Sequence, residues 1–111
     1  MCLTRVGGQK MLPVAMLGLG NQENLYADAE KRWTAAYVPA FLRRYPFVLA
    51  DLPDRAMGVC IDEAFPGWSE HTGEELFDGT GANTLFLQHA LDFLHQYQLE
   101  YEKTVAFCQR L

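Results

Sequence analysis

The second half of this chain contains very little positive charge. Residues 58–111 hold two Lys or Arg against nine Asp or Glu, a balance of −7, whereas residues 1–57 hold seven against five, a balance of +2. The net charge of the whole chain is −5. A general nucleic-acid binder needs a basic stripe that displaces counterions from phosphates, so we predict no nucleic-acid partner.

Cysteine is scarce, and long hydrophobic runs are missing. Cys2, Cys60 and Cys108 are far apart and form no CxxC pair, so the sequence predicts neither a disulfide framework nor a zinc site. No window approaches the roughly 18 apolar residues that span a bilayer, and the N-terminus lacks the apolar stretch of a signal peptide. We therefore predict a cytoplasmic protein with no membrane span and no bound metal.

Motifs of catalysis and cofactor binding are also absent from the sequence. No nucleophile elbow, P-loop or dinucleotide fingerprint occurs. His89 and His95 would lie on different faces of a helix, so they cannot share a metal ion. Residues 78–83 lack the alternating acidic ligands of a calcium loop. We predict no catalytic residue and no cofactor, and we find no internal repeat in the sequence.

The sequence contains enough hydrophobic residues to form the core of one small domain. The chain has 111 residues, of which 50% are hydrophobic, and we predict a single domain over residues 1–111. Met1–Val6 and Lys10–Leu19 flank Gly7-Gly8-Gln9, which indicates a β-hairpin whose glycines supply positive φ angles. Pro13 cannot donate a ladder hydrogen bond, so its strand should lie at an edge or begin near Val14.

A second hairpin follows from Phe47–Asp51 and Met57–Asp62, joined by a turn at residues 52–55. The four strands predict a small antiparallel sheet with one covered face. The segments 21–32 and 63–82 have the polar composition of loops. The paired acidic residues of the second loop could do acid–base work or bind cations, but we favour a structural explanation, in which they complement the positive end of the helix that follows.

A short aromatic helix is predicted within residues 33–47. Aromatic side chains recur every four positions from Trp33 to Tyr45, the spacing that lines one helix face. Pro39 suits a first helical turn, and Pro46 prevents the helix from continuing.

Adjacent arginines in this block, Arg43 and Arg44, are the best candidates for contact with an anion or carboxylate, because guanidinium groups bind such groups through two hydrogen bonds. The alternative is that they form internal ion pairs with Asp51, Asp62 or another acidic residue, while their stems pack on the aromatic face. The predicted ligand- or partner-binding residues are Arg43, Arg44, Tyr37, Trp33 and Asp62.

The longest element is an amphipathic helix over about Asn83 to Leu111, capped by Asn83 or Thr84. At the standard rise it would be ~40 Å long, whereas a compact domain of this size has a radius of gyration of about 13 Å. Its apolar end should therefore extend beyond its own domain and contact a second copy, which predicts a homodimer. The predicted interface residues are Leu94, Tyr97, Tyr101, Val105 and Cys108.

Several stretches in a fixed order resemble the SapC-like family of bacterial proteins. They are Val14–Leu19, Glu23–Tyr26, Trp33, Tyr37–Ala40, Arg43–Phe47, Cys60–Asp62 and Leu76–Asp78, followed by a helix with Thr104 and Phe107. The resemblance covers about Leu12 to Leu111, and its most specific part is the arginine–aromatic block. Family members are roughly twice as long, so the chain is expected to match the central part of a longer family sequence.

The resemblance implies no established reaction. Members are often encoded near outer-membrane receptors and flavin-dependent halogenase-like proteins, which implies an accessory role in the uptake or modification of a nutrient or peptide. The main hypothesis is an α+β, non-catalytic binding or assembly module that associates with itself through the long helix. The alternative is a small enzyme or anion-binding protein that uses Arg43, Arg44 and Tyr37, with Asp62 or Glu63 as the base.

Overall fold

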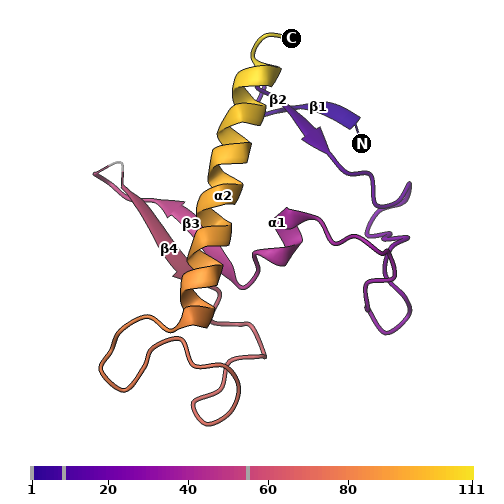
Figure 1. The fold of residues 1–111 in the computed structure, drawn as a ribbon. Helices are drawn as coiled ribbons and strands as arrows, with labels where there is room; N and C mark the ends of the chain where they lie inside the picture. The colour runs from indigo at the N-terminus through magenta and orange to yellow at the C-terminus, as the bar shows by residue number, and fades with distance from the viewer. Residues whose placement is uncertain (1, 9, 55) are drawn as a thin grey trace. The chain divides into compact units, whose positions relative to one another are not determined.

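A computed structural model describes residues 2–8, 10–54 and 56–111 of the chain. It has α+β architecture, as predicted, with two hairpins, a short helix and a long C-terminal helix (Figure 1). The chain divides into two compact units. Unit 1 comprises Met1–Pro39 and Leu99–Leu111, and unit 2 comprises Ala40–Gln98.

Unit 1 contains the first hairpin, in which β1 (Cys2–Val6) pairs with β2 (Lys10–Val14) in antiparallel register. Gly7 and Gly8 have φ angles of 62° and 85°, the left-handed region that a tight turn requires and that glycine enters without a steric penalty. Pro13 pairs with Leu3. In a two-stranded sheet every strand is an edge, so a proline is tolerated within β2.

Unit 2 contains the second hairpin, formed by β3 (Phe47–Asp51) and β4 (Met57–Ile61). The predicted strands are confirmed, but the two hairpins form separate two-stranded sheets rather than one sheet of four. Position 55 of the predicted turn lies outside the described residues, as do Met1 and Gln9 of the first hairpin.

The aromatic helix is much shorter than its spacing predicted. Helix α1 comprises Ala40–Arg43 only, so the four-residue repeat of aromatics from Trp33 onward is not a helix face. The reason is Pro39, which disfavours the helical conformation at the residue before it and so prevents extension toward Trp33. The expected end before Pro46 is confirmed, since the chain leaves the helix at Arg44 and enters β3 at Phe47.

Helix α2 (Leu85–Cys108) is continuous over 24 residues, as predicted, and lies a little inside the expected limits. Thr84 caps it, because its hydroxyl accepts a hydrogen bond from the Leu87 amide at 3.3 Å and its carbonyl accepts the amide of Gln88 at 2.9 Å. The first part of α2 belongs to unit 2 and the last part to unit 1.

The hydrophobic core of unit 2 lies between β3 and α2. Phe47, Leu87 and Leu94 are buried in one cluster, and Leu94 is only 1% exposed. Five partly buried side chains pack around them: Leu49, Trp68, Leu76, Ala90 and Leu91. The core is small, so each of its three buried side chains matters for stability.

An aspartate organises the loop that follows the first hairpin. One carboxylate oxygen of Asp28 accepts hydrogen bonds from the amides of Glu30 (3.0 Å) and Arg32 (2.8 Å), and the Asp28 amide donates to the Arg32 carbonyl at 2.9 Å. Thr34 closes the loop, since its amide and hydroxyl both donate to the Tyr26 carbonyl, at 2.7 and 3.0 Å.

Unit 2 contains the same loop around Asp78. One oxygen of Asp78 accepts the amides of Thr80 (2.8 Å) and Ala82 (3.0 Å), and the Asp78 amide donates to the Ala82 carbonyl at 2.8 Å. The amide and hydroxyl of Thr84 donate to the Leu76 carbonyl at 3.1 and 3.2 Å. Hydrogen bonds from the Thr80 hydroxyl and these amides lower the pKa of Asp78.

The two loops are therefore a structural repeat with the pattern Asp-x5-Thr, 50 positions apart. The third residue after each aspartate has a positive φ, 63° at Lys31 and 83° at Gly81. Each unit thus contains a β-hairpin followed by an Asp-x5-Thr loop. The sequence analysis missed the repeat because the aspartate and the threonine are the only residues that the two seven-residue loops share.

Candidate functional site

Trp33 and Tyr37, two of the predicted binding residues, lie in unit 1. The Trp33 indole donates a hydrogen bond to the Tyr37 carbonyl at 3.1 Å, and its ring stacks on Tyr26 with centroids 5.6 Å apart. Trp33 is half-buried, whereas the Tyr37 side chain is 65% exposed. These contacts give Trp33 a structural role in holding the loop around Asp28.

The arginine pair packs on aromatic rings of unit 2. The Arg44 guanidinium carbon lies 4.3 Å from the centroid of Phe41 and 5.2 Å from that of Tyr97, and its Nε donates to the Phe41 carbonyl at 3.3 Å. Arg43 lies 5.3 Å from the ring centroid of Phe93. Cation–π contacts with α2 are therefore an observed role of both arginines.

Asp62, the predicted partner of the arginines, is held by a tyrosine instead. The Tyr45 hydroxyl donates to Asp62 Oδ2 at 2.9 Å, and Oδ1 accepts the Ala64 amide at 2.9 Å. The hydrogen bond to Asp62 raises the pKa of Tyr45, because ionisation of the phenol would break it and place two negative charges together. Arg44 takes part in none of the ion pairs found among the described residues.

The structure thus divides the predicted site between its two units. Trp33 and Tyr37 belong to unit 1, and Arg43, Arg44 and Asp62 belong to unit 2. Neither of the two hollows described next is lined by any of these residues. Whether these residues bind a ligand or partner stays a prediction.

The sequence analysis missed an aromatic hollow in unit 2, with a volume of about 630 Å³. Its lining includes Phe47, Phe65 and Trp68, whose rings meet edge to face: Phe47–Trp68 centroids are 6.0 Å apart and Phe65–Trp68 centroids 5.7 Å apart. Phe77 and Phe86 also line it and are 57% and 46% exposed. The Trp68 indole donates to the Asp62 carbonyl at 2.8 Å, which fixes the orientation of its ring.

Acidic side chains line the same hollow. Glu70, Glu74 and Glu75 belong to its wall, and the ion pairs found among the described residues include none of them. The sequence has no Lys or Arg from residue 56 to residue 102. The signal that could have located this site is the combination of Phe65, Trp68 and these acids within one segment of the chain.

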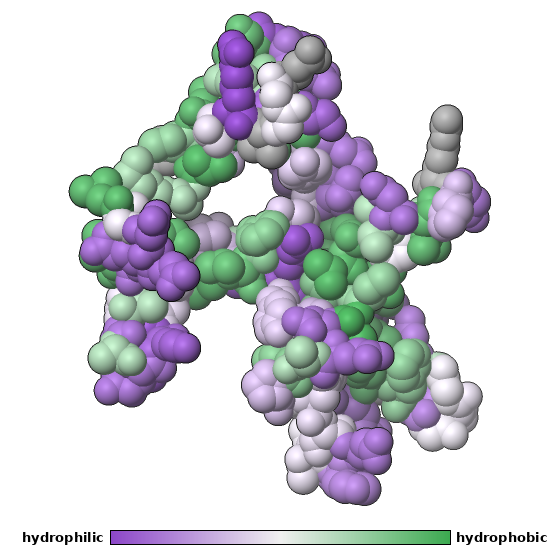
Figure 2. All heavy atoms as spheres, turned by 180° about the vertical axis from the view of Figure 1, so that it is seen from behind, coloured by the Kyte–Doolittle hydropathy of each residue, from purple (hydrophilic) through white to green (hydrophobic). Residues whose placement is uncertain are grey.

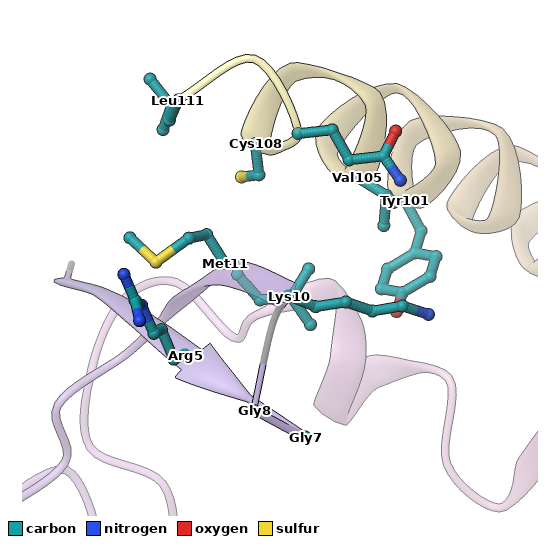
Figure 3. A pocket seen from close by; sticks show the side chains of 11 residues that line it. Arg5, Gly7, Gly8, Lys10, Met11, Tyr101, Val105, Cys108 and Leu111 are labelled. Atoms are coloured by element: carbon teal, nitrogen blue, oxygen red, sulfur yellow. The ribbon is translucent and has the colours of Figure 1, made fainter.

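A second hollow, of about 1150 Å³, lies in unit 1 between the first hairpin and the last turns of α2 (Figure 3). Its apolar lining includes Met11, Tyr101 and Val105, and its hairpin side adds two cationic side chains, Arg5 and Lys10. In Figure 3 the Lys10 side chain extends toward Tyr101 across the hollow.

The predicted interface residues differ sharply in their exposure. Leu94 is 1% exposed and Cys108 is 5% exposed, and Cys108 also lines the hollow of unit 1. Tyr97 is half-buried beneath Arg44. Tyr101, which is 41% exposed, and the half-buried Val105 line the hollow of unit 1. Whether these residues contact a second copy stays a prediction.

Two further searches of the structure concern metals and membranes. Over residues 2–8, 10–54 and 56–111, no group of three or more His, Cys, Asp or Glu side chains converges as metal ligands would. Within the same ranges, no helix has the length and apolar character to cross a membrane.

Comparison with protein families identifies the chain. The model of the SapC family matches residues 2–111, so the chain belongs to the SapC family, as its sequence motifs indicated. Searches of the curated proteins and of the solved structures found no match.

Proposed function

We propose that this SapC-family chain is a binding and assembly module that covers its exposed apolar surface with a second copy of itself. The observation that carries the proposal is the amount of hydrophobic surface left uncovered. Among the described residues, four hydrophobic side chains are buried and twenty-one large ones are exposed. Figure 2 shows such hydrophobic residues, in green, at the surface of the face that it displays.

Strand β4 shows how incompletely the core of unit 2 is covered. Ile61 lies opposite the buried Phe47, and Val59 lies opposite Leu49, so these side chains share one face of the sheet. Nevertheless Ile61 and Val59 are 46% and 45% exposed. One sheet face therefore has buried apolar residues on β3 and exposed apolar residues on β4. An exposed apolar patch of this kind is typical of a surface that binds a partner.

The excess surface is large enough for a stable interface. The chain exposes 9332 Å², whereas two separate compact domains of half its mass would together expose about 7,500 Å². The excess of about 1,800 Å² is more than twice the roughly 800 Å² that one partner contributes to a standard interface.

We assign the contact with the second copy to the hollow of unit 1, because Tyr101 and Val105 bring an apolar lining to it. An interface formed by the same surface on both copies closes as a twofold dimer. The accessory role in uptake or modification that the family resemblance implies would then be exerted by binding and not by catalysis, in the cytoplasm.

The alternative function, an anion-binding protein or enzyme built on Arg43 and Arg44, has less support. Of the two carboxylates that could complete such a site, Asp62 and Glu63, Asp62 accepts a hydrogen bond from the Tyr45 hydroxyl. Arg44 packs on the rings of Phe41 and Tyr97.

Sedimentation velocity of the wild-type chain over a wide range of concentration tests the proposal. We expect a monomer–dimer equilibrium that Val105→Glu shifts strongly to monomer, because it places a charge in an apolar contact. Ala106→Glu adds the same charge to the neighbouring, exposed position outside the hollow and should leave the dimer intact. Circular dichroism at 222 nm would confirm that both variants keep α2.

A wild-type chain that stays monomeric at high concentration would refute the proposed function. A dimer that both variants weaken equally would show that the assigned surface is wrong.

A further inference from the structure

The aromatic hollow of unit 2 has the chemistry of a binding site for an organic cation. Three kinds of observation meet there: a hollow of about 630 Å³, aromatic side chains that are partly exposed, and glutamates among the lining residues. The volume lies within the range of small-molecule sites.

Contacts position three of the aromatic side chains that line the hollow. Trp68 is held by its hydrogen bond to the Asp62 carbonyl and by edge-to-face contacts with Phe47 and Phe65. Tyr45 continues this arrangement, since its ring meets Phe65 at 90° with centroids 5.4 Å apart. Aromatic faces that are fixed before a ligand arrives attract a cation through the negative charge of the ring face without a further loss of side-chain entropy.

The charged side chains that line the hollow favour a positively charged ligand. Glu70, Glu74 and Glu75 line the hollow and make no ion pair with another described residue. Their summed field repels anions and attracts cations.

The nature of the walls favours an organic cation over a metal ion. A hard metal ion needs several oxygen ligands that replace its water shell, and the described residues contain no such convergent group. An alkylated ammonium ion is weakly hydrated and apolar on its surface, so aromatic faces can surround it, and carboxylates need only lie nearby.

We propose that this hollow binds a small organic cation with an alkylated ammonium group, whose charge is balanced by Glu70, Glu74 and Glu75. The inference rests on unit 2 alone and does not depend on self-association of the chain.

The test uses choline as the probe and 3,3-dimethyl-1-butanol as its neutral isostere, which has the same shape without the charge. Binding is followed by Trp68 fluorescence in a Trp33→Phe background, since the chain has two tryptophans and Trp33 lies in unit 1. We expect choline to bind about tenfold or more tightly than the neutral alcohol.

Variants with matched controls test whether the side chains that line the hollow contribute to choline binding. Phe77→Leu keeps an apolar side chain but removes a ring, and should weaken choline binding several-fold. Phe107→Leu removes a ring that is similarly exposed but outside the hollow, and should have no effect. Glu74→Gln should weaken binding, whereas Glu63→Gln, in the same loop but outside the hollow, should not.

Equal binding of choline and the neutral alcohol would overturn the proposal, as would unchanged binding in both Phe77→Leu and Glu74→Gln. Binding of a trimethyllysine peptide without binding of free choline would also overturn it, because the site would then recognise a polypeptide. Isothermal titration calorimetry with the same ligands provides a readout that is independent of Trp68.

Discussion

Replacing Leu94 by alanine should destabilise unit 2 severely. Leu94 is 1% exposed and forms a three-residue core with Phe47 and Leu87. Truncation of a buried leucine to alanine removes the transfer free energy of its methyl groups and leaves a cavity, at a cost of about 3–5 kcal/mol. Partly buried neighbours such as Leu91 can relax into the space, so we expect about 3 kcal/mol.

This loss is large relative to the stability of so small a unit. At roughly 0.05–0.15 kcal/mol per residue, a unit of this size has a free energy of unfolding of about 3–9 kcal/mol. Leu94→Ala should therefore remove at least about a third of this free energy of unfolding, and all of it if the unit lies at the lower limit. Leu85→Ala makes the same change at the first residue of α2, where the side chain is 72% exposed, and should cost less than about 1 kcal/mol.

Urea unfolding followed by Trp68 fluorescence in the Trp33→Phe background measures both variants. The free energy of unfolding falls linearly with urea concentration, so the shift of the midpoint multiplied by this slope gives the change in the free energy of unfolding. The reverse background, Trp68→Phe, reports the environment of Trp33 in unit 1 and shows whether the loss is confined to unit 2. If Leu94→Ala shifted the midpoint no more than Leu85→Ala does, the core between β3 and α2 would not exist as described.

Three further changes test local structure. Gly81→Ala should lower the free energy of unfolding by about 1 kcal/mol, because a φ of 83° is strained for a residue with a Cβ. Gly79 has neither a positive φ nor a close neighbour, so Gly79→Ala should be neutral or slightly stabilising. Urea unfolding measures both variants. The pKa of Asp78 is lowered by hydrogen bonds from a threonine hydroxyl and backbone amides. Its contribution to stability is therefore complete above the unfolded pKa and is lost as pH falls through the lower folded pKa. Unfolding curves of Asp78→Asn should lack this loss. The pKa of Tyr45 is raised by its hydrogen bond to Asp62, so that contribution is present below the ordinary tyrosine pKa and lost as pH rises through the higher folded value. An absorbance titration of tyrosinate should therefore lose a component that titrates above the ordinary tyrosine pKa when Tyr45 is replaced in Tyr45→Phe.

The elements with strong local signals could be predicted from the sequence. The two hairpins follow from strand patterns joined by turn residues, and the glycines at 7 and 8 have the positive φ angles expected. Thr84 caps α2 as predicted, because a cap depends only on the residues next to it. Helix α1 was overestimated because the aromatic spacing of Trp33 was weighed without the restriction that Pro39 places on its neighbour.

The candidate site could not be predicted in the same way, because it depends on contacts between distant parts of the chain. The sequence suggested that an arginine would hold Asp62, whereas the structure places Tyr45 there, 17 residues earlier. Edge-to-face packing of Phe47 with Trp68 brings together a strand and a loop whose sequence shows no periodicity. The Asp-x5-Thr repeat was missed for a related reason, since its hydrogen bonds are mostly made by the backbone.

Salt concentration separates the two proposals, because they rest on different forces. Self-association through Tyr101 and Val105 buries apolar surface, which salt does not screen and which excluded salts strengthen. Choline binding draws part of its affinity from three exposed carboxylates, whose field is screened beyond about 10 Å at 0.1 M salt and about 3 Å at 1 M. Raising sodium chloride over this range should therefore leave the dimer intact while it weakens choline binding several-fold. A dimer that dissociates as salt rises would show that charges hold the two copies together, and the apolar hollow of unit 1 would no longer account for the assembly.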